Sequence, residues 1–528
     1  MAEDWVRAIG RDELTQKGRA VFRRGRKQIV LFATPDGVRA CDNRCPHEGY
    51  PLRAGTLDES CVLTCNWHNW KFDLRSGENL YGGDALRVYP VDVRDGAVWL
   101  DLTEAPLGER RARAMANLRD AFDDHDYERI AREIARLGRI GAEPVEAVVE
   151  AVQWSHDRFE FGWTHAYAAA ADWLALHDRT EGDDDARLAC LVEIVGHIAD
   201  DTLRQPSFAY AEGARDYDPD ALVAAIEAED EATAIALARG AFAAGLGFDA
   251  IEPALSRAAL AHYNDFGHSL IYVAKAGPLI ARLGPRVALP LTLALIRRLV
   301  FARREDLIPD FRAYAPALEA WSSRRGRAAR PTAAAFKGLN TRKALARTLS
   351  FAGAPPMALY DALLGANAAN MLAFDLAHQD RVAGQIKDNV GWLDFTHGLT
   401  FANAVRRQCE KYPALWPAGL LQMACFAGRN APYTLAEPDL DRWRVADARA
   451  FFDRAVAGLF DHGREEYIVS AHLLKTTLAA REEVLAGGAN GAAPLVTAAL
   501  NRFLNSPLKR KHVRRAAHQA RAFVALAG

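Results

Sequence analysis

Two pairs of cysteine and histidine lie close together near the start of the chain. Cys45-Pro46-His47 and Cys65-Asn66-Trp67-His68 form the pattern C-x-H-x17-C-x2-H. Such a set can hold a [2Fe–2S] cluster, with two thiolates on one iron and two imidazoles on the other. Neutral imidazole ligands reduce the negative charge of the site and raise its reduction potential. The spacing therefore predicts a one-electron carrier with the ligands Cys45, His47, Cys65 and His68.

A structural zinc site is the alternative for the same residues, because tetrahedral zinc is also bound by two cysteines and two histidines. Zinc fingers usually present a pair of cysteines followed by a pair of histidines. The two mixed pairs of this chain favour the iron–sulfur cluster.

The words around these pairs, CPHEGYPLRAG and CNWHNWKFDLRSGEN, resemble the two loops of the Rieske ferredoxin and Rieske oxygenase family. Respiratory members of the family brace these loops with a disulfide at positions that here are Tyr50 and Trp67. The chain therefore resembles the ferredoxin-like, lower-potential branch more closely. The family pattern gives Cys41 and Cys61 no role, and we expect both thiols to be buried by packing.

A basic run precedes the cluster pattern. It could dock an acidic electron donor or belong to a solvated edge strand, and we favour the strand for its members Arg19, Arg23, Arg24, Arg26 and Lys27.

The region after residue 150 holds 12 of the chain's 15 histidines. Three D-x-x-H words span Asp265–His268, Asp375–His378 and Asp394–His397, and an H-x-x-K word spans His472–Lys475. Residues three apart share one face of a helix, which is how helical bundles present carboxylates and imidazoles to a metal. A single word of this kind is more often a hydrogen-bonded polar pair on an amphipathic helix. The words therefore allow a di-iron carboxylate site without requiring one.

Taken in order, four stretches resemble the questin oxidase-like family of iron-dependent oxygenases. They are GWTHA at 162–166, FGHSLI at 266–271, WLDFTHGLTFANA at 392–404 and AHLLKT at 471–476. The resemblance implies a helical domain and oxidative ring opening of aromatic polyketides, with iron held by histidines and a lysine that can be carboxylated. Carried over position by position, the implied metal ligands are His165, His268, His397, His472 and Lys475.

Some assignments around these ligands stay open. His156 competes with His165 in the first stretch. We take Lys475 and Asp394 as candidate catalytic residues, and we expect the substrate pocket to be lined by the nearest aromatic side chains, Trp392, Phe395 and Phe401.

Lys475 could bind iron only under a physical condition. An ammonium group has no lone pair and cannot be a ligand. A neutral amine, its pKa lowered by burial and a nearby metal, could react with CO₂ to give an anionic carbamate. The alternative is a lysine that extends its charged end to the surface.

Composition excludes several classes of function. The formal net charge of −2 gives no bias toward nucleic acid or anionic membranes. The first residues are charged, and the longest apolar run, Val287–Ile296, is too short to span a bilayer. Seven cysteines do not make a disulfide scaffold in a chain of 528 residues. We expect a cytoplasmic protein.

The composition and the spacing of apolar residues change after about residue 103. Before it, short runs at 28–33, 61–65, 86–93 and 97–102 alternate with Gly-containing turns and predict strands. Beyond it the chain is rich in alanine, with helical spacing of apolar residues at 222–242, 356–374 and 445–460. We predict a small all-β domain at 1–103, a linker at 104–112 and a large all-α domain at 113–528.

Some expected partners of a Rieske cluster are absent from the sequence. The D-x2-H-x4-H word of the helix-grip Rieske oxygenases does not occur, nor does a G-x-G-x-x-G after a strand or a plant-type C-x4-C-x2-C. Electrons must therefore come from a separate NAD(P)H-dependent reductase or ferredoxin.

Together these observations predict an oxygenase that delivers electrons from the cluster to a non-haem iron in the helical domain. That iron would activate O₂ to oxidise an organic, aromatic or polyketide-like substrate. Two alternatives remain: a di-iron carboxylate oxygenase, and a non-catalytic electron carrier whose helical domain docks a partner.

Overall fold

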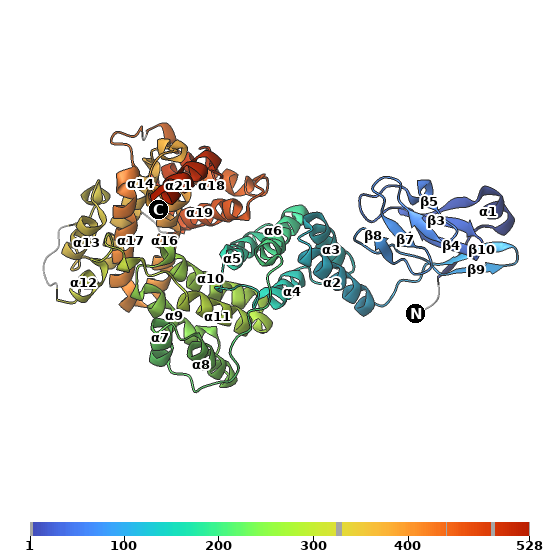
Figure 1. Cartoon of the computed structure of the whole chain (residues 1–528), viewed down its shortest axis with the longest axis horizontal. Helices are drawn as coiled ribbons and strands as arrows, with labels where there is room; N and C mark the ends of the chain where they lie inside the picture. The colour runs from blue at the N-terminus through green and yellow to red at the C-terminus, as the bar shows by residue number, and fades with distance from the viewer. Residues whose placement is uncertain (1–3, 324–329, 440, 487–490, 527–528) are drawn as a thin grey trace. The chain divides into compact units, whose positions relative to one another are not determined.

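The computed structural model of the chain describes residues 4–323, 330–439, 441–486 and 491–526. Its contacts divide the chain into two compact units, one formed by residues 1–121 and 136–142 and the other by residues 122–135 and 143–528. The strands belong to the first unit, whereas the described elements of the second are helices (Figure 1). The predicted fold class, a small β domain followed by a large helical region, is confirmed.

Three antiparallel sheets form the β part of the first unit. The strands are β1 (Trp5–Gly10), β2 (Arg19–Arg24), β3 (Lys27–Thr34), β4 (Gly37–Asp42), β5 (Thr56–Leu57), β6 (Val62–Thr64), β7 (Lys71–Asp73), β8 (Asn79–Tyr81), β9 (Val91–Arg94) and β10 (Ala97–Asp101), with the short helix α1 (Arg11–Lys17) after β1. They are ordered β1-β10-β9, β2-β3-β4 and β5-β6-β7-β8. Asp95 and Gly96, with φ of 47° and 69°, form the tight turn between β9 and β10, as their sequence predicts.

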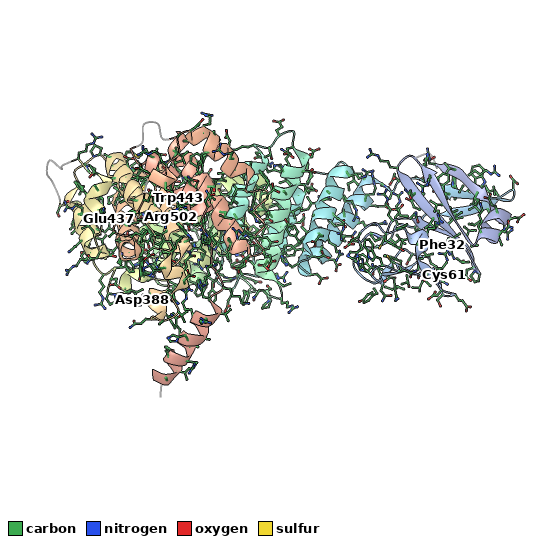
Figure 2. The ribbon with its side chains drawn as sticks, turned by 90° about the horizontal axis from the view of Figure 1, so that it is seen from above. Phe32, Cys61, Asp388, Glu437, Trp443 and Arg502 are labelled. Carbon is green, nitrogen blue, oxygen red and sulfur yellow. The ribbon has the colours of Figure 1, made fainter. Side chains whose placement is uncertain are left out.

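Strand β3 divides its side chains between two cores, because successive residues of a strand point to opposite faces. Val30 and Phe32 pack in one core with Cys45 and Cys65, while Ile29 and its alternate neighbour Leu31 pack in the other. The first core therefore lies directly under the residues of the predicted cluster. Figure 2 labels Phe32 among the side chains of this unit.

Two sequence expectations for this unit need comment. The strand predicted at 86–93 is wrong over most of its length, since β9 begins only at Val91; Pro90, which precedes it, lacks the N–H that a ladder needs. The basic run lies on and just after β2, which is an edge strand with Arg23 and Arg24 exposed. Its position agrees with the favoured edge-strand interpretation.

The helices after the β domain are α2 (Leu107–Asp123), α3 (Tyr127–Arg139), α4 (Glu146–Ser155), α5 (His165–His177), α6 (Asp184–Thr202), α7 (Pro219–Glu227), α8 (Glu231–Ala243), α9 (Phe248–Ala261), α10 (His268–Leu283), α11 (Pro285–Val300), α12 (Tyr314–Glu319), α13 (Thr341–Ser350), α14 (Pro356–Leu372), α15 (Ala377–Asp380), α16 (Trp392–Lys411), α17 (Trp416–Asn430), α18 (Ala448–Ala457), α19 (Tyr467–Ala486), α20 (Ala493–Leu504) and α21 (Val513–Leu526). None of the helices within the described ranges is both long and apolar enough to cross a membrane.

Helix boundaries follow local signals in the sequence. The window predicted at 222–242 is two helices, because Glu229 has φ of 56° and the side chain of Asp230 caps α8. The windows at 356–374 and 445–460 correspond to α14 and α18. The stretch 104–112, predicted to be a linker, is already helical from Leu107.

Helices α5, α10, α16 and α19 pack around one another, since α5 contacts α10 and α19, and α16 contacts the same two helices. They run in the same direction: His165 and Asp172 of α5 face His268 and Lys275 of α10, with equal spacing on both helices. Likewise, α16 residues His397 and Arg406 lie against Lys475 and Glu483 of α19. Parallel neighbours need long connections, so the four helices come from distant parts of the sequence.

Candidate metal centres

The four predicted cluster ligands lie on two loops with the same backbone geometry. In each loop the cysteine N–H donates to the carbonyl five residues later, at 2.9 Å for Cys45 to Tyr50 and 2.8 Å for Cys65 to Trp70. The residue four positions after each cysteine has positive φ, 76° at Gly49 and 63° at Asn69, and these are residue types that tolerate this conformation. Two matching loops can thus clamp one group between them.

The side chains of these loops gather at one place, which we call the cluster site (Cys45, His47, Cys65 and His68). The two thiols are buried and interact with one another, and the two imidazole rings lie 4.6 Å apart between centroids. His68 is exposed, whereas Nδ1 of His47 is buried without a hydrogen-bond partner.

These features fit a [2Fe–2S] cluster. An orphaned buried nitrogen is costly unless it binds something, and a metal ion would take its lone pair. Burial raises the pKa of the Cys45 thiol to about 12, so a thiolate there needs positive charge, which the irons of a cluster supply. The mixed set of two thiolates and two imidazoles is the set that a Rieske cluster uses.

The neighbouring positions agree with the sequence analysis. Tyr50 and Trp67 occupy the positions of the respiratory disulfide, with ring centroids 5.7 Å apart. Cys41 and Cys61 are fully buried, as expected for thiols that pack in a core.

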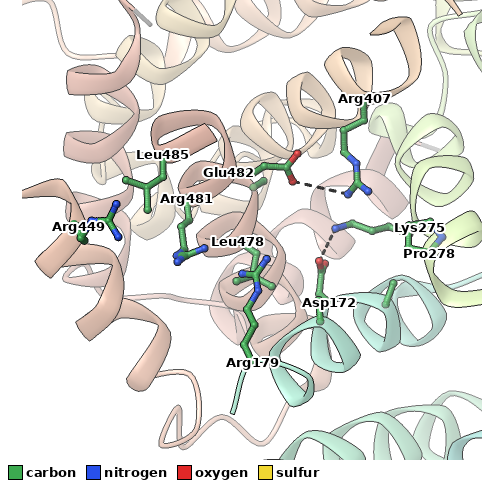
Figure 3. A pocket seen from close by; sticks show the side chains of 13 residues that line it. Asp172, Arg179, Lys275, Pro278, Arg407, Arg449, Leu478, Arg481, Glu482 and Leu485 are labelled. Atoms are coloured by element: carbon green, nitrogen blue, oxygen red, sulfur yellow. Dashed lines mark hydrogen bonds and ion pairs between the residues drawn. The ribbon is translucent and has the colours of Figure 1, made fainter. Parts of the chain in front are cut away.

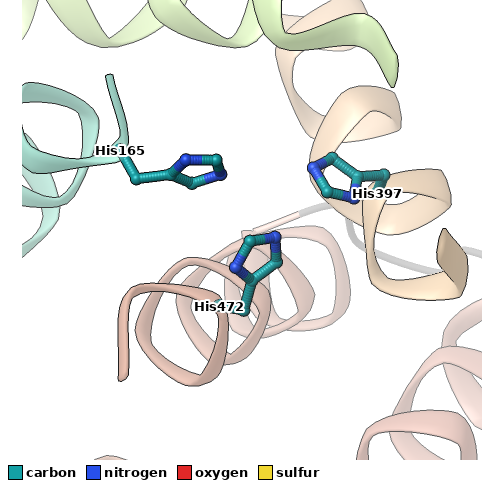
Figure 4. A group of neighbouring side chains, drawn as sticks. All are labelled: His165, His397 and His472. Atoms are coloured by element: carbon teal, nitrogen blue, oxygen red, sulfur yellow. The ribbon is translucent and has the colours of Figure 1, made fainter. Parts of the chain in front are cut away.

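In the helical unit, four histidines that the sequence analysis singled out converge on one point, which we call the imidazole site (His165, His268, His397 and His472). Nε2 of His268 lies 3.2 Å from Nε2 of His165 and 2.9 Å from Nε2 of His397. The ring of His472 lies 4.8 Å from that of His165 and 4.9 Å from that of His397. Figure 4 shows three of these rings turned toward one another from three different helices.

Backbone carbonyls orient three of the four rings. Nδ1 of His397 donates to Leu393 O at 2.5 Å, Nδ1 of His472 donates to Ile468 O at 2.6 Å, and Nδ1 of His268 donates to Asp265 O. A carbonyl can only accept, so each Nδ1 carries the hydrogen and each neutral ring keeps a lone pair on Nε2. This is the arrangement of metal-ligating histidines.

The described side chains leave part of the inward set of nitrogens without a hydrogen-bond donor, although Lys475 Nζ lies 3.4 Å from Nε2 of His397. Nε2 of His472 is buried without a partner, and the Nε2 lone pairs of His268 and His397 face each other at 2.9 Å. Burial, the first cause, lowers the pKa of all four imidazoles well below the usual value, with the Lys475 charge or neighbouring histidines acting in the same direction. The rings are therefore neutral, and a cation between them would relieve the repulsion.

Lys475 belongs to the same centre. Its Nζ lies 3.4 Å from Nε2 of His397, and its side chain is buried. The alternative in which this lysine extends to the surface is therefore wrong. Burial lowers the pKa of Lys475 to about 7, so the neutral amine is accessible near neutral pH.

The turn before α10 is built to place His268. Asp265, Phe266 and Gly267 have φ of 49°, 54° and 74°, a run of left-handed residues that turns the Asp265 carbonyl toward His268. A Cβ at Gly267 would lie 2.4 Å from the Phe401 ring. Strained backbone of this kind persists where the surroundings hold it, often at functional sites.

His165 is placed by a cap at the start of α5. The Thr164 hydroxyl accepts from the N–H of Ala166 at 3.2 Å and donates to Asp201 at 2.5 Å. The competing His156 lies elsewhere, its ring stacked on Tyr210. The structure thus brings His165, and not His156, to the imidazole site.

The aspartates of the three D-x-x-H motifs interact with other groups and not with the imidazoles. Asp265 pairs with Arg298, Asp375 accepts from the N–H of Ala377 at 3.0 Å, and Asp394 accepts from the N–H of Gly391 at 2.8 Å and from Arg429 at 3.1 Å. Asp394 therefore caps α16, the helix that carries His397.

The aromatic side chains expected to line a substrate pocket are part of the helix packing. The rings of Trp392 and Phe395 pack against Phe374, and the ring of Phe401 packs against Phe426. All three predicted liners are buried.

Comparison with known proteins identifies the first unit. The model of the Rieske [2Fe-2S] domain matches residues 4–87. A 3-phenylpropionate/cinnamic acid dioxygenase ferredoxin subunit from Photorhabdus laumondii subsp. laumondii is 33% identical over 78 residues, which are 14% of this chain and 74% of that protein. The chain belongs to the Rieske [2Fe-2S] family.

Two further Rieske relatives are matched over very different shares of their own length. The 3-chlorobenzoate-3,4-dioxygenase oxygenase subunit of Comamonas testosteroni is 33% identical over 113 residues, which are 19% of this chain and 26% of that protein. The ferredoxin of carbazole 1,9a-dioxygenase from Nocardioides aromaticivorans IC177 is 25% identical, with 18% of this chain and 95% of that chain covered and a TM-score of 0.17.

Sequence reasoning missed the residues that support these ligands. From the sequence, Thr164 could be recognised only as a possible N-cap and Asp201 only as an acidic residue of a helix. The backbone carbonyls that orient the rings leave no signal in the sequence. The short word D-F-G-H did contain a signal, because a glycine directly before a helix marks a turn.

Proposed function

We propose that this protein is a Rieske-type oxygenase, in which electrons accepted at the cluster site are used at a non-haem iron in the imidazole site to oxidise an organic substrate with O₂. The observation that carries the proposal is the convergence of four neutral imidazoles, two of them buried (His397 and His472) and two half-buried (His165 and His268), with Nε2 separations of 2.9 and 3.2 Å. Histidines with a merely structural role have no reason to meet from four separate helices.

The donor set fits a redox-active metal. The Nε2 separations of 2.9 and 3.2 Å match adjacent ligands of one ion at metal–nitrogen distances of about 2.1 Å. Imidazole suits iron, copper, nickel and zinc. Iron is favoured because the same chain carries a one-electron carrier, which a zinc site could not use. Bound there, iron would supply the reduction and activation of O₂.

The side chains around the metal have separable roles in this proposal. The imidazoles hold the ion, and their carbonyl partners fix which nitrogen faces it. Lys475, beside His397, would take part as a neutral amine or as an anionic carbamate, since an ammonium next to a metal cation would be repelled. Asp394 acts through α16, because its contacts are with Gly391 and Arg429.

The electron donor would be a separate NAD(P)H-dependent reductase or ferredoxin. The exposed His68 and the 55% exposed Trp67 place the edge of the cluster site at the surface of its unit, where a partner can approach. Two relatives of the first unit, a dioxygenase ferredoxin subunit and a dioxygenase oxygenase subunit, support an oxygenase system.

The experiment is an iron count on purified protein. We expect about three irons per chain, two in the cluster and one at the imidazoles. His397→Ala should reduce this to about two irons, keep the Rieske electron paramagnetic resonance signal and abolish O₂ consumption. The matched control is His378→Ala, a histidine of another D-x-x-H word whose ring packs against Tyr433, and it should keep all the iron.

Other counts would support the alternatives. Two irons in the unmodified protein would favour an electron carrier, and four would favour a di-iron site, although the carboxylates of the D-x-x-H words are engaged elsewhere. If His397→Ala keeps the full iron content, the proposal is wrong.

A further inference from the structure

A cavity lies two helical turns from the imidazole site, along the same four helices. Its lining includes Asp172 of α5 and Lys275 of α10, each seven residues after the histidine at the start of its helix. Seven residues advance about 10 Å along a helix axis. On α19, Leu478 lines the cavity one turn beyond Lys475. The cavity therefore begins one turn beyond Lys475 on α19 and about two turns beyond the histidines on α5 and α10.

An ion pair forms the inner end of this cavity. Lys275 Nζ lies 2.5 Å from Oδ1 of Asp172, and both side chains are largely buried, at 12% and 7% exposed. Oδ2 of Asp172 is buried without a partner. Figure 3 shows the pair meeting at one end of the cavity.

The outer part of the cavity carries excess positive charge. Apart from the inner pair, four of the residues that line the cavity are basic and one is acidic. Within the described chain, no carboxylate lies at ion-pair distance from Arg179, Arg449 or Arg481, while Glu482, the acidic residue, is bound at 2.7 Å by Arg406. Arg179 and Arg449 are exposed and Arg481 is half-buried. Unpaired guanidinium groups around one opening attract an anion, because they match carboxylate geometry.

The walls between these charges are apolar, and the size suits a small molecule. Ala175, Pro278, Leu478 and Leu485 contribute to the lining, and the volume is about 490 Å³. Pockets for small organic ligands have volumes of about 300–1,000 Å³ and combine apolar walls with few polar groups.

We propose that this cavity binds the substrate of the helical unit and that the substrate is an organic acid, with its carboxylate at Arg481 and Arg449 and its apolar body along Leu478 and Pro278 toward the imidazoles. The inference rests on the proposed oxygenase function and names its substrate class.

The test uses 2-naphthoate and its uncharged analogue 2-naphthamide as probes, titrated into the full-length protein by isothermal titration calorimetry. The acid should bind at least about tenfold more tightly than the amide, since charge-assisted hydrogen bonds are the strong ones. Arg481→Gln and, separately, the exposed-rim variant Arg449→Gln should weaken naphthoate about tenfold and leave the amide unchanged. Arg342→Gln, at an exposed residue of α13, is the control and should change neither. Equal binding of acid and amide, or full naphthoate affinity in both variants, would overturn the inference.

A second readout separates this inference from the proposed function. His397→Ala should still bind naphthoate, because the cavity lies two turns from that ring. If the protein lacks the additional iron but prefers naphthoate through Arg481, the oxygenase proposal fails and the acid-binding cavity stands. In iron-loaded protein, naphthoate should change the electron paramagnetic resonance line shape of the additional iron. Tight naphthoate binding without that change would contradict the assignment of this cavity as the substrate site.

Discussion

The ligands of the cluster site lie within 24 consecutive residues, from Cys45 to His68, whereas the imidazole site joins His165 to His472 across more than 300 residues. Loops hold the first set, and their cysteines are fixed by repeated backbone hydrogen bonds. Four parallel helices hold the second, and carbonyls of the helices or of the preceding turn fix three of its four rings. The cluster site leaves Nδ1 of His47 free for a ligand, and the imidazole site leaves Nε2 of His472 free. The spacing of ligands in the sequence therefore reveals a site built from neighbouring residues, but it does not reveal a site that helix packing assembles from distant residues.

The largest effect is expected when the ligands of one site are changed and the other site is left intact. His68→Cys should destroy the Rieske signal or move it toward that of an all-cysteine cluster, because an imidazole ligand is lost. It should leave the additional iron bound, since the ligands of that ion belong to the other unit. Electron paramagnetic resonance and iron analysis measure both. Loss of the additional iron in this variant would show that the two sites are not independent.

The charge of Lys475 offers the next largest effect. Lys475→Arg places a permanent cation beside His397, and repulsion from a divalent ion about 4 Å away should lower iron affinity by at least about a hundredfold. Lys475→Met, similar in length and neutral, should lose less iron than the arginine variant. Iron titrations of the two variants measure the difference. A fully iron-loaded Lys475→Arg protein would mean that this lysine only carries a structural positive charge.

These expectations show how far the sequence could predict the structure. The strands predicted at 28–33 and 97–102 and the Asp95-Gly96 turn followed from periodicity and turn residues, and motif spacing marked the two loops of the Rieske domain. The helical character of the region after the β domain also followed from the sequence, and α14 lies where the spacing of apolar residues predicts it.

The imidazole site could be reached only through short resemblances. Its geometry depends on parallel packing of helices separated by long connections, and no local pattern encodes that register. The polar residues at 104–112 predict a linker, whereas α2 begins inside this stretch at Leu107, because charged residues are also common in exposed helices. The Asp172–Lys275 pair had a weak signal, seven residues beyond His165 and His268, that becomes meaningful only when the two helices are known to be parallel.

The turn before His268 provides a smaller test. Gly267→Ala puts a methyl group against Phe401 on a residue with φ of 74°, a cost of about 1–3 kcal/mol. Because His268 follows directly, iron affinity should fall about tenfold while the cluster signal stays unchanged. Gly277→Ala in the same helix is the matched control, since a Cβ there meets only ordinary contacts at 3.6 Å or more. Equal iron affinity in the two variants would show that the turn does not position the imidazole.

The smallest expected effect concerns Asp201, which holds the cap of α5. Burial raises the pKa of Asp201 to about 6, above its value in the unfolded chain. The buried charge therefore destabilises the fold above about pH 6, and the cost disappears as the pH falls toward about 4. Asp201→Asn should raise the free energy of unfolding by about 1 kcal/mol at pH 8 and by less at pH 5.

Thermal unfolding at both pH values measures the Asp201 effect, with Asp200→Asn, at a side chain that is 47% exposed, as the control. A gain that grows toward low pH would have the wrong sign for a carboxyl group with a raised pKa.

The central claim is that one chain carries two separate iron sites, one held by loops and one by parallel helices. Anomalous scattering at the iron absorption edge, from crystals of the purified protein, tests it most directly. We expect two iron peaks between Cys45, His47, Cys65 and His68, and one more peak within about 2.3 Å of nitrogens from at least three of His165, His268, His397 and His472. An empty space among those imidazoles, in crystals whose cluster irons are fully present, would contradict it.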